Sequence, residues 1–162
     1  MSVGRVCSHS VDIVGVNDSV HDAACCMRDR DVSVLVVVDT LQRPVGMLTA
    51  HDLVARALTV APAEAMALAV GAVMTPNPNV IAEEAPLEAA VSLMTFAGAR
   101  SLPVVDREGR IVGLVTLDGV TTQLAEELAN IGNLLESQMP YRRERRMSKP
   151  CDVSRQMTGG SS

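Results

Sequence analysis

The chain has 162 residues, of which 48% are hydrophobic and 20% charged, so it has enough apolar material for a packed interior, and wholesale disorder is excluded. Phe96 and Tyr141 are its only aromatic side chains, which excludes a base-stacking platform for single-stranded nucleic acid. Residues 1–139 hold eight arginines against 17 acidic side chains, a net charge of −9, whereas residues 140–162 have a net charge of +4; the long acidic part is therefore expected to repel a phosphate backbone.

The cellular setting can be predicted from the apolar runs and the cysteines. No run approaches 18 apolar residues without a charge, and the first residues lack the apolar stretch of a signal peptide. We therefore expect a soluble, cytoplasmic protein. No CxxC spacing occurs, so reduced and partly buried thiols are favoured over a redox or metal site. The cysteines are Cys7, Cys25, Cys26 and Cys151.

The chain contains an internal repeat with a period of 67 residues. Residues 3–57 align without gaps on residues 70–124, and 13 of the 55 pairs are identical. The identities cluster by element, so each copy is predicted to be one supersecondary unit. Because about 55 residues bury too little surface to be stable alone, we expect the two copies to share one core about an approximate two-fold axis, with two equivalent clefts between them.

In the first copy, residues 13–16 predict a short apolar strand. A helix is expected to start at Ser19, with apolar residues at helical spacing. Residues 34–38 are continuously apolar, which indicates a strand buried on both faces. A third strand, 45–48, and a closing helix follow.

The second copy repeats this order, with strands at 80–82, 102–105 and 111–115 and a helix that starts at Pro86. Its closing helix is long and carries one apolar stripe, formed by Val120, Leu124, Leu128, Ile131 and Leu135. The pattern is β-α-β-β-α twice, which predicts an α/β (α+β) fold. We expect a first repeat at 1–58, an Ala-rich bridge at 59–69, a second repeat at 70–138, and a basic, mostly disordered tail at 139–162.

Thr49 and Asp52 stand where the third strand of the first copy meets its closing helix. A hydroxyl and free N–H groups at a helix start suit a phosphate, and a carboxylate there can accept hydrogen bonds from a ribose diol. The alternative is purely structural, with Thr49 capping the helix and Asp52 placed in its first turn by the helix dipole. Thr116 is the counterpart of Thr49 in the second copy.

The motifs in this order resemble the cystathionine-β-synthase (CBS) domain. They are an apolar strand, the helix pattern L/V-x-x-A-x-x-x-M, a Leu-Pro-Val-Val-Asp strand at 102–106, and Gly-h-h-Thr-x-x-Asp at 46–52, where h is apolar. Two in tandem resemble a CBS pair, or Bateman module, and the resemblance covers about residues 3–138. It implies a regulatory module that binds AMP, ADP, ATP, NAD or S-adenosylmethionine between the repeats, needs no cofactor, and pairs into a disc-like homodimer.

The resemblance also implies roles for individual residues. Asp52 is expected to hold the ribose hydroxyls, Thr49 the ribose or phosphate edge, and Met47 to line the pocket. Adenine is expected to meet the segment around Asn79 and Val80.

A basic residue that reaches the phosphate is expected at Arg100, close to Pro103 of the same strand. The alternative for Arg100 is an ordinary surface arginine.

The two clefts are expected to differ. Gly119 replaces the ribose carboxylate and Ser33 replaces the phosphate cation, and both changes fall on the cleft around Thr116. We therefore expect one competent cleft, at Asp52 and Arg100, and one weak or vacant cleft. Asp118 is expected near the phosphate end of the competent cleft, where it would favour AMP, ADP or a dinucleotide over a triphosphate.

No phosphate loop, metalloprotease motif or serine-nucleophile motif occurs, and His9, His21 and His51 lack metal-ligand spacing, so an enzyme is not expected. The favoured function is a non-catalytic adenine-nucleotide sensor that acts on an unidentified partner protein. The alternatives are an oligomerisation or interaction module with a vestigial nucleotide site and, less favoured, nucleic-acid binding through the basic cluster at 141–146.

Overall fold

The computed structural model describes residues 1–57, 59 and 62–138, which form two compact units that divide after Leu124. The predicted basic tail at 139–162 lies outside the described residues. No described helix is long and apolar enough to cross a membrane.

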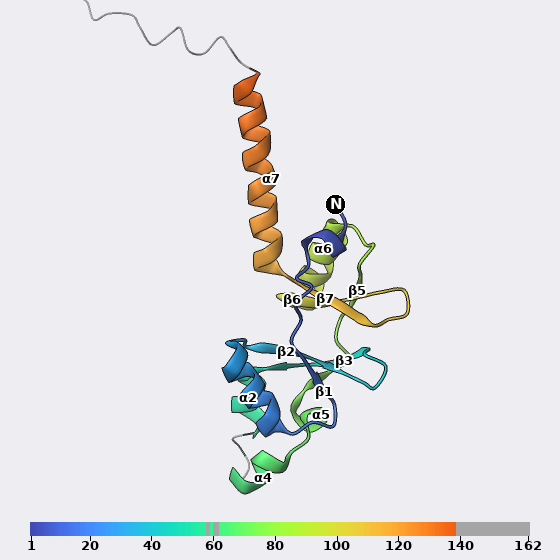
Figure 1. Cartoon of the computed structure of the whole chain (residues 1–162), viewed down its shortest axis with the longest axis vertical. Coiled ribbons are helices and arrows are strands. Elements are labelled where there is room, and N and C mark those ends of the chain that lie inside the picture. Colours follow the sequence, from blue (N-terminus) through green and yellow to red (C-terminus); the bar gives the residue numbers. More distant parts are fainter. Residues whose placement is uncertain (58, 60–61, 139–162) are drawn as a thin grey trace, which may run out of the picture. The chain divides into compact units, whose positions relative to one another are not determined.

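The elements follow the duplicated order predicted from the sequence (Figure 1). Those of the first half are α1 (Val3–Val6), β1 (Ile13–Gly15), α2 (Val20–Arg30), β2 (Val34–Val38), β3 (Pro44–Thr49), α3 (Ala50–Asp52), a π-helical turn η1 (Leu53–Ala57) and α4 (Pro62–Ala67). Those of the second half are α5 (Val70–Val73), β4 (Thr75–Pro76), β5 (Ile81–Ala82), α6 (Leu87–Ala97), β6 (Ser101–Val105), β7 (Ile111–Thr116) and α7 (Leu117–Ser137).

The mixed α/β fold is confirmed, and each predicted strand begins and ends within one residue of its expected position. Ser19 caps α2, because its hydroxyl accepts a hydrogen bond from the N–H of Asp22 at 3.0 Å, and Pro86 stands at the cap position of α6. Sequence periodicity missed α1, α5 and β4, because elements of two to four residues are too short to show a period.

The strands form two sheets of similar design. In each sheet the central strand pairs in parallel with the strand before its helix and antiparallel with the strand that follows it, in the orders β1-β2-β3-β4 and β5-β6-β7. β4 pairs with β3, and the corresponding contact on the second sheet is a bridge between Ser8 and Leu114. The leading segment of each repeat therefore pairs with the outer strand of the other repeat's sheet, as strand β4 in one case and as a single bridge in the other.

This exchange of leading segments is reciprocal. The N–H of Gly4 donates to the carbonyl of Glu83 at 2.9 Å, and the N–H of Gly71 donates to the carbonyl of Val16 at 2.9 Å. Val3 of α1 is fully buried in the core of the second repeat, and Val70 of α5 is fully buried in that of the first. Contacts that exchange the two repeats in this way define an approximate two-fold relation between them.

Two core clusters are present, so the expected single shared core is wrong. Each cluster lies between one sheet and its helix, α2 for the first sheet and α6 for the second, and Figure 1 shows these helices on the outer sides of the sheets. Val36 and Pro103 are fully buried and belong to neither cluster. Because side chains alternate along a strand, they occupy the opposite faces of β2 and β6, where the repeats meet.

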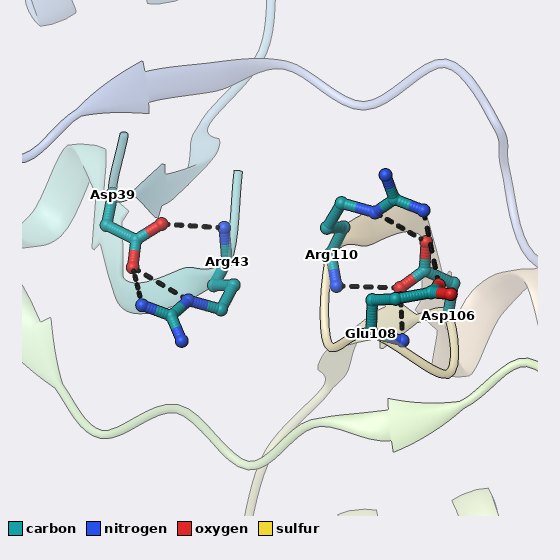
Figure 2. A network of polar contacts seen from close by, with 5 residues as sticks. All are labelled: Asp39, Arg43, Asp106, Glu108 and Arg110. Carbon is teal, nitrogen blue, oxygen red and sulfur yellow. Dashed lines mark hydrogen bonds and ion pairs between the residues drawn. The ribbon is translucent and has the colours of Figure 1, made fainter. Parts of the chain in front are cut away.

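The turns between the second and third strands of the two sheets are also duplicated. The carboxylate of Asp39 accepts a hydrogen bond from the Nε of Arg43 at 3.0 Å, and that of Asp106 accepts one from the Nε of Arg110 at 2.9 Å. Figure 2 shows the two networks side by side, with Glu108 as an additional acceptor for Arg110.

Candidate functional site

Thr49 and Asp52 are held together at the junction of β3 and α3. The carboxylate of Asp52 accepts hydrogen bonds from the N–H and the hydroxyl of Thr49, both at 2.9 Å, and the N–H of Asp52 donates to the Thr49 oxygen at 3.1 Å. This reciprocal capping box confirms the structural role that the spacing allowed. Asp52 is only 9% exposed and is the one buried charged residue in the described part of the chain.

The capping box leaves part of the carboxylate unused. The three hydrogen bonds of the box involve Oδ2 of Asp52 and the oxygen of Thr49, whereas the nearest cation to Oδ1 is Nη2 of Arg56, at 4.0 Å. A carboxylate has room for about four hydrogen bonds, so Oδ1 can still accept from a ligand hydroxyl. The capping role and a binding role are therefore compatible.

Arg56 joins the two sides of this site, and the sequence analysis did not single it out. Its Nη1 donates to the carbonyls of Val73 at 3.0 Å and Met74 at 2.9 Å, so it ties η1 to the segment that leads into β4. The detectable signal was its spacing of four residues from Asp52, which places both side chains on one helix face. Gln123 is the counterpart in the second repeat.

Met47 connects this corner to the next strand. It is half-buried on β3, where it pairs with Val36 on one side and with Thr75 of β4 on the other. The chain then passes through Asn79 and Val80, both exposed, before it enters β5. The predicted adenine-contacting segment thus follows directly from a strand that pairs with Met47.

Because of Pro103, the backbone hydrogen bonding at Asn79 differs from that of the corresponding segment in the first repeat. In the first repeat the N–H of Val36 donates to the carbonyl of Asp12 at 3.0 Å. Pro103 occupies the matching position and has no N–H, so the carbonyl of Asn79 cannot receive that bond. For this reason β5 starts at Ile81, one residue after Val80, which is the position that corresponds to the start of β1. Pro103 itself is fully buried.

Arg100 precedes β6, and its side chain is exposed. Its Nη2 lies 3.7 Å from Oδ1 of Asp118, and its carbonyl accepts the N–H of Leu117 at 2.8 Å. No contact between Arg100 and Asp52 occurs among the described residues. The expected neighbourhood of Asp118 and Arg100 is present, in the form of an exposed ion pair.

The second cleft contains a cavity of about 340 Å³. Thr116 and Leu114 of β7 form one wall, and Ser33, which precedes β2, lies on the other. The remaining lining is Ser8, Ser10, Val11, Asp12, Asp31, Val32, Val34 and Ser101. Hydroxyls, carboxylates and aliphatic side chains line this cavity, and none of the lining residues is an arginine or a lysine.

The 67-residue offset of the repeat relates these lining residues to positions expected at the first cleft. Thr116, Leu114 and Ser33 correspond to Thr49, Met47 and Arg100, and Asp12 corresponds to Asn79. Four of the eight predicted site residues are therefore the counterparts of residues that line one cavity: Met47, Thr49, Asn79 and Arg100. At the corresponding sequence positions of the first cleft, Arg100 replaces the hydroxyl-bearing Ser33.

A further cavity of about 380 Å³ lies at the carboxyl ends of β1 and β2. Asn17 and Thr40 are part of its lining. At the matching positions of the second repeat Arg107 donates to Glu84 at 2.8 Å, a contact that Asn17 and Thr40 cannot form. The lining of this cavity therefore differs between the two repeats.

The thiols offer no metal site in the described part of the chain, where no group of three histidine, cysteine or acidic side chains is assembled. Cys7 is buried, and burial raises the pKa of its thiol, which keeps it protonated. Cys25 and Cys26 are half-buried and form no disulfide within the described residues, while Cys151 lies outside them.

Comparison with solved structures reproduces this architecture. The CBS-pair protein CBSX2 from Arabidopsis thaliana is 28% identical, with a TM-score of 0.70 over 79% of this chain and 96% of that chain. A structure of CBSX2 in complex with AMP is 28% identical, with a TM-score of 0.66 over 77% and 96% of the two chains. The CBS domain pair of protein MJ0100, in complex with 5′-methylthioadenosine and S-adenosyl-L-methionine, is 26% identical, with a TM-score of 0.65 over 76% and 99%.

Sequence comparison agrees. An uncharacterised protein of Methanopyrus kandleri is 29% identical over 122 residues, which are 74% of this chain and 61% of that protein, so this chain spans less than two thirds of that relative. The CBS domain family matches this chain twice, at residues 3–58 and 70–126. The chain therefore belongs to the CBS-domain family, as a tandem CBS pair.

Proposed function

We propose that the chain is a non-catalytic regulatory module that senses an adenosine-containing ligand in the first cleft, between its two CBS repeats. The observation that carries the proposal is the buried carboxylate of Asp52, which is fixed by Thr49 and still has an oxygen available to a ribose diol. The AMP complex of CBSX2 and the 5′-methylthioadenosine and S-adenosyl-L-methionine complex of the MJ0100 pair support an adenosyl ligand.

The proposed roles follow the chemistry of the cleft. Asp52 accepts from the ribose hydroxyls, and Thr49 holds the adjoining edge. The carbonyl of Asn79, which Pro103 leaves without its strand partner, accepts from the exocyclic amine of adenine, while Val80 and Met47 supply apolar contacts. The base is then held by aliphatic groups and backbone rather than by stacking.

Arg100 is the proposed phosphate contact. Its guanidinium is exposed and only loosely paired with Asp118, at 3.7 Å, so it can turn toward an anion at small cost. Asp118 stands beside it and repels additional negative charge, which favours AMP, ADP or NAD over ATP. In the second cleft, Ser33 and Gly119 lack both charged groups, so that cleft is proposed to bind the same ligands weakly or not at all.

The proposed output is a change in packing. Arg56 joins η1, next to Asp52, to the segment that forms the other wall of the cleft, so ligand binding at Asp52 changes the balance of contacts on both walls. A homodimer of CBS pairs and a regulated protein would respond to this change. The residues of the cleft recognise the ligand and do not indicate which protein is regulated.

Isothermal titration with AMP, ADP, ATP, NAD and S-adenosylmethionine tests the proposal. We expect one binding site per chain and a loss of affinity of at least tenfold in Asp52→Asn, since a charge-assisted hydrogen bond contributes about 1.5–3 kcal/mol. Asp22→Asn is the matched control, because Asp22 is an exposed acidic residue in the first turn of α2.

Two results would overturn the proposal. One is no binding of any of the five ligands at millimolar concentration, and the other is binding that Asp52→Asn leaves unchanged. Thermal unfolding of each variant without ligand separates a lost contact from a weakened capping box.

A second candidate function is an oligomerisation or protein-interaction module whose nucleotide site is vestigial. The observation in its favour is the apolar stripe of α7, whose leucines and isoleucine are exposed. Failure of all five ligands to bind, together with self-association of the chain, would support this candidate.

A further inference from the structure

The end of α7 carries an apolar seam with coiled-coil spacing, which we call the α7 seam. It consists of Leu124, Leu128, Ile131 and Leu135, which are 45%, 69%, 53% and 57% exposed. The intervals of four, three and four residues are those of a heptad repeat, with Leu128 and Leu135 at position a and Leu124 and Ile131 at position d. In a coiled coil, each side chain at position a or d packs into a space between four side chains of the facing helix. Such a seam therefore needs a second helix with the same spacing.

The sequence that follows the seam does not repeat its apolar spacing. Continuing the register beyond Leu135 places Gln138, Arg142, Arg145, Lys149 and Asp152 at positions a and d. The apolar seam therefore stops before residue 138, and residues 139–162 have no matching row of apolar side chains. A second copy of the chain has one, and it is identical.

We propose that two copies of this chain associate through the α7 seam in antiparallel orientation. In this pairing Leu128 of each copy packs on Ile131 of the other, and Leu124 packs on Leu135, which gives four apolar layers over about 16 Å of helix. This pairing names the surface through which two copies associate in the proposed function. It does not depend on which ligand binds in the cleft.

Small residues beside the seam favour the antiparallel orientation. Ala125 and Gly132 both occupy position e, and in an antiparallel pair these two positions face each other across the interface. Neither side chain obstructs a close approach of the helix backbones. In a parallel pair each would instead face a position-g residue, which is Glu127 or Leu134.

Charge favours the same orientation. Residues 1–123, which precede the seam, hold eight arginines against 14 acidic side chains, a net charge of −6, and a parallel pair would place two such regions at the same end of the interface. An antiparallel pair separates them.

The interface is short, so a reversible dimer is expected rather than a permanent one. Sedimentation equilibrium of the full chain over a range of concentrations should show a mean mass that rises from one chain toward two. Leu128→Glu should weaken the association at least tenfold, because each symmetric pair then contains the buried charge twice. Asn133→Glu is the matched control, since it adds the same charge at an exposed position f of the same helix and should leave the association unchanged.

A cross-linking experiment tests the orientation. In a background with the native cysteines replaced by alanine, Ala125→Cys combined with Gly132→Cys should form a covalent dimer under mild oxidation, and neither single variant should. Failure of the double variant to form the covalent dimer would overturn the antiparallel pairing, because in a parallel pair each position e faces position g and the two cysteines do not meet. Preferential cross-linking of either single variant would overturn it as well.

Other outcomes decide whether a second copy is the occupant. A mass of one chain at all concentrations, or a dimer that Leu128→Glu leaves intact, would overturn the proposal. So would a dimer that forms only after residues 139–162 are deleted, because the deleted segment would then be what covers the seam. Titration of Leu128→Glu with AMP keeps the two proposals apart, since loss of the seam should leave ligand binding at Asp52 in place.

Discussion

The first and second repeats bury almost the same residues at matching positions, whereas the positions that face the clefts differ. Val3 and Val70, and likewise Leu35 and Leu102, are equivalent pairs with at most 1% exposure. By contrast Asp52 is matched by Gly119 in the other repeat. Burial has therefore kept the two copies alike where they pack, whereas the two charged residues proposed for the first cleft, Asp52 and Arg100, are matched by Gly119 and Ser33.

The comparison also shows that neither repeat is a self-contained unit. Each core includes the leading helix of the other repeat, so the sequence period of 67 residues and the packed cores are offset from each other. Movement of one repeat relative to the other would therefore act directly on both cores. This interlocking suits a module in which binding between the repeats is transmitted through their packing.

The largest expected effect tests this interlocking. Val3→Ala should lower the free energy of unfolding by about 2 kcal/mol, although the residue stands three positions from the start of the chain, because two buried carbons are lost and a cavity is left. Val70→Ala should cost about the same. Chemical denaturation of both variants measures the two losses.

Arg5→Ala, an exposed substitution on the same helix, is the control and should change stability by less than about 0.5 kcal/mol. If Val3→Ala behaved like Arg5→Ala, α1 would not contribute to the core of the second repeat.

Much of the fold could be predicted because the sequence contains it twice. Two copies with the same apolar spacing confirm each other, and the strands were placed within one residue in both. The exchange of leading segments could not be predicted. Its hydrogen bonds join backbone atoms, such as the N–H of Gly4 and the carbonyl of Glu83, and leave no residue-specific signal. Its buried side chains, Val3 and Val70, belong to helices of four residues, which are too short to show a period.

The candidate site was partly predictable for a similar reason. Thr49 and Asp52 form a local motif, and the structure brings them together as the spacing suggested. Arg56 was missed because its acceptors are the carbonyls of Val73 and Met74, 17 and 18 residues away. The roles of Met47, Asn79, Val80, Arg100 and Thr116 toward a ligand stay predictions.

The next effect concerns this missed residue. Arg56→Gln, which makes the first repeat resemble the second at this position, should lower stability by about 1 kcal/mol. The guanidinium is half-exposed, so water replaces part of the lost hydrogen bonding. The expected loss of stability is therefore smaller than the value of about 1.5–3 kcal/mol for a buried charged hydrogen bond. The same variant should weaken AMP binding several-fold, because it releases the wall that contains Asn79.

Urea denaturation and AMP titration of Arg56→Gln provide the two readouts. Arg28→Gln is the control, since Arg28 is exposed and pairs only with its neighbour Asp29 among the described residues. Equal effects of the two variants would show that Arg56 does not hold the cleft wall.

A smaller effect, of opposite sign, is expected at Gly119. In both repeats the threonine oxygen accepts an N–H at 3.1 Å, from Asp52 in one and from Gly119 in the other. Gly119→Asp should therefore complete a second capping box and raise stability by about 0.5–1 kcal/mol. An added Cβ would lie 3.1 Å from the Thr116 oxygen, a close contact that the first repeat already accommodates.

Gly119→Ala separates the two contributions to this gain, because it improves helix propensity without adding a carboxylate. Thermal unfolding of both variants is the measurement. A loss of stability in Gly119→Asp would mean that the start of α7 differs from that of α3 more than the shared hydrogen bond indicates.

The smallest effect concerns the two duplicated turns of Figure 2. Hydrogen bonds from the N–H groups of Arg43 and Leu41 and from the Arg43 guanidinium lower the pKa of Asp39, against a smaller opposing effect of burial. For Asp106, burial is the largest single influence and acts upward, but the N–H and guanidinium of Arg110 and the N–H of Glu108 together lower the pKa. A carboxyl whose pKa is lower in the folded chain stabilises it above the pKa of the unfolded chain. That stability is lost as the pH falls through the folded value.

Asp39→Asn and Asp106→Asn should therefore each reduce the loss of stability on acidification between about pH 5 and pH 2, since the amide keeps a hydrogen-bond acceptor and removes the titrating charge.

At neutral pH Asp39→Asn should cost slightly more than Asp106→Asn, because Arg110 keeps Glu108 as a partner at 3.2 Å, whereas Leu41 occupies the matching position beside Arg43. Both turns are exposed, so the differences are small and need denaturation curves at several pH values. Equal costs at neutral pH would show that the additional carboxylate of Glu108 contributes nothing, and that the two turns are energetically as well as geometrically duplicated.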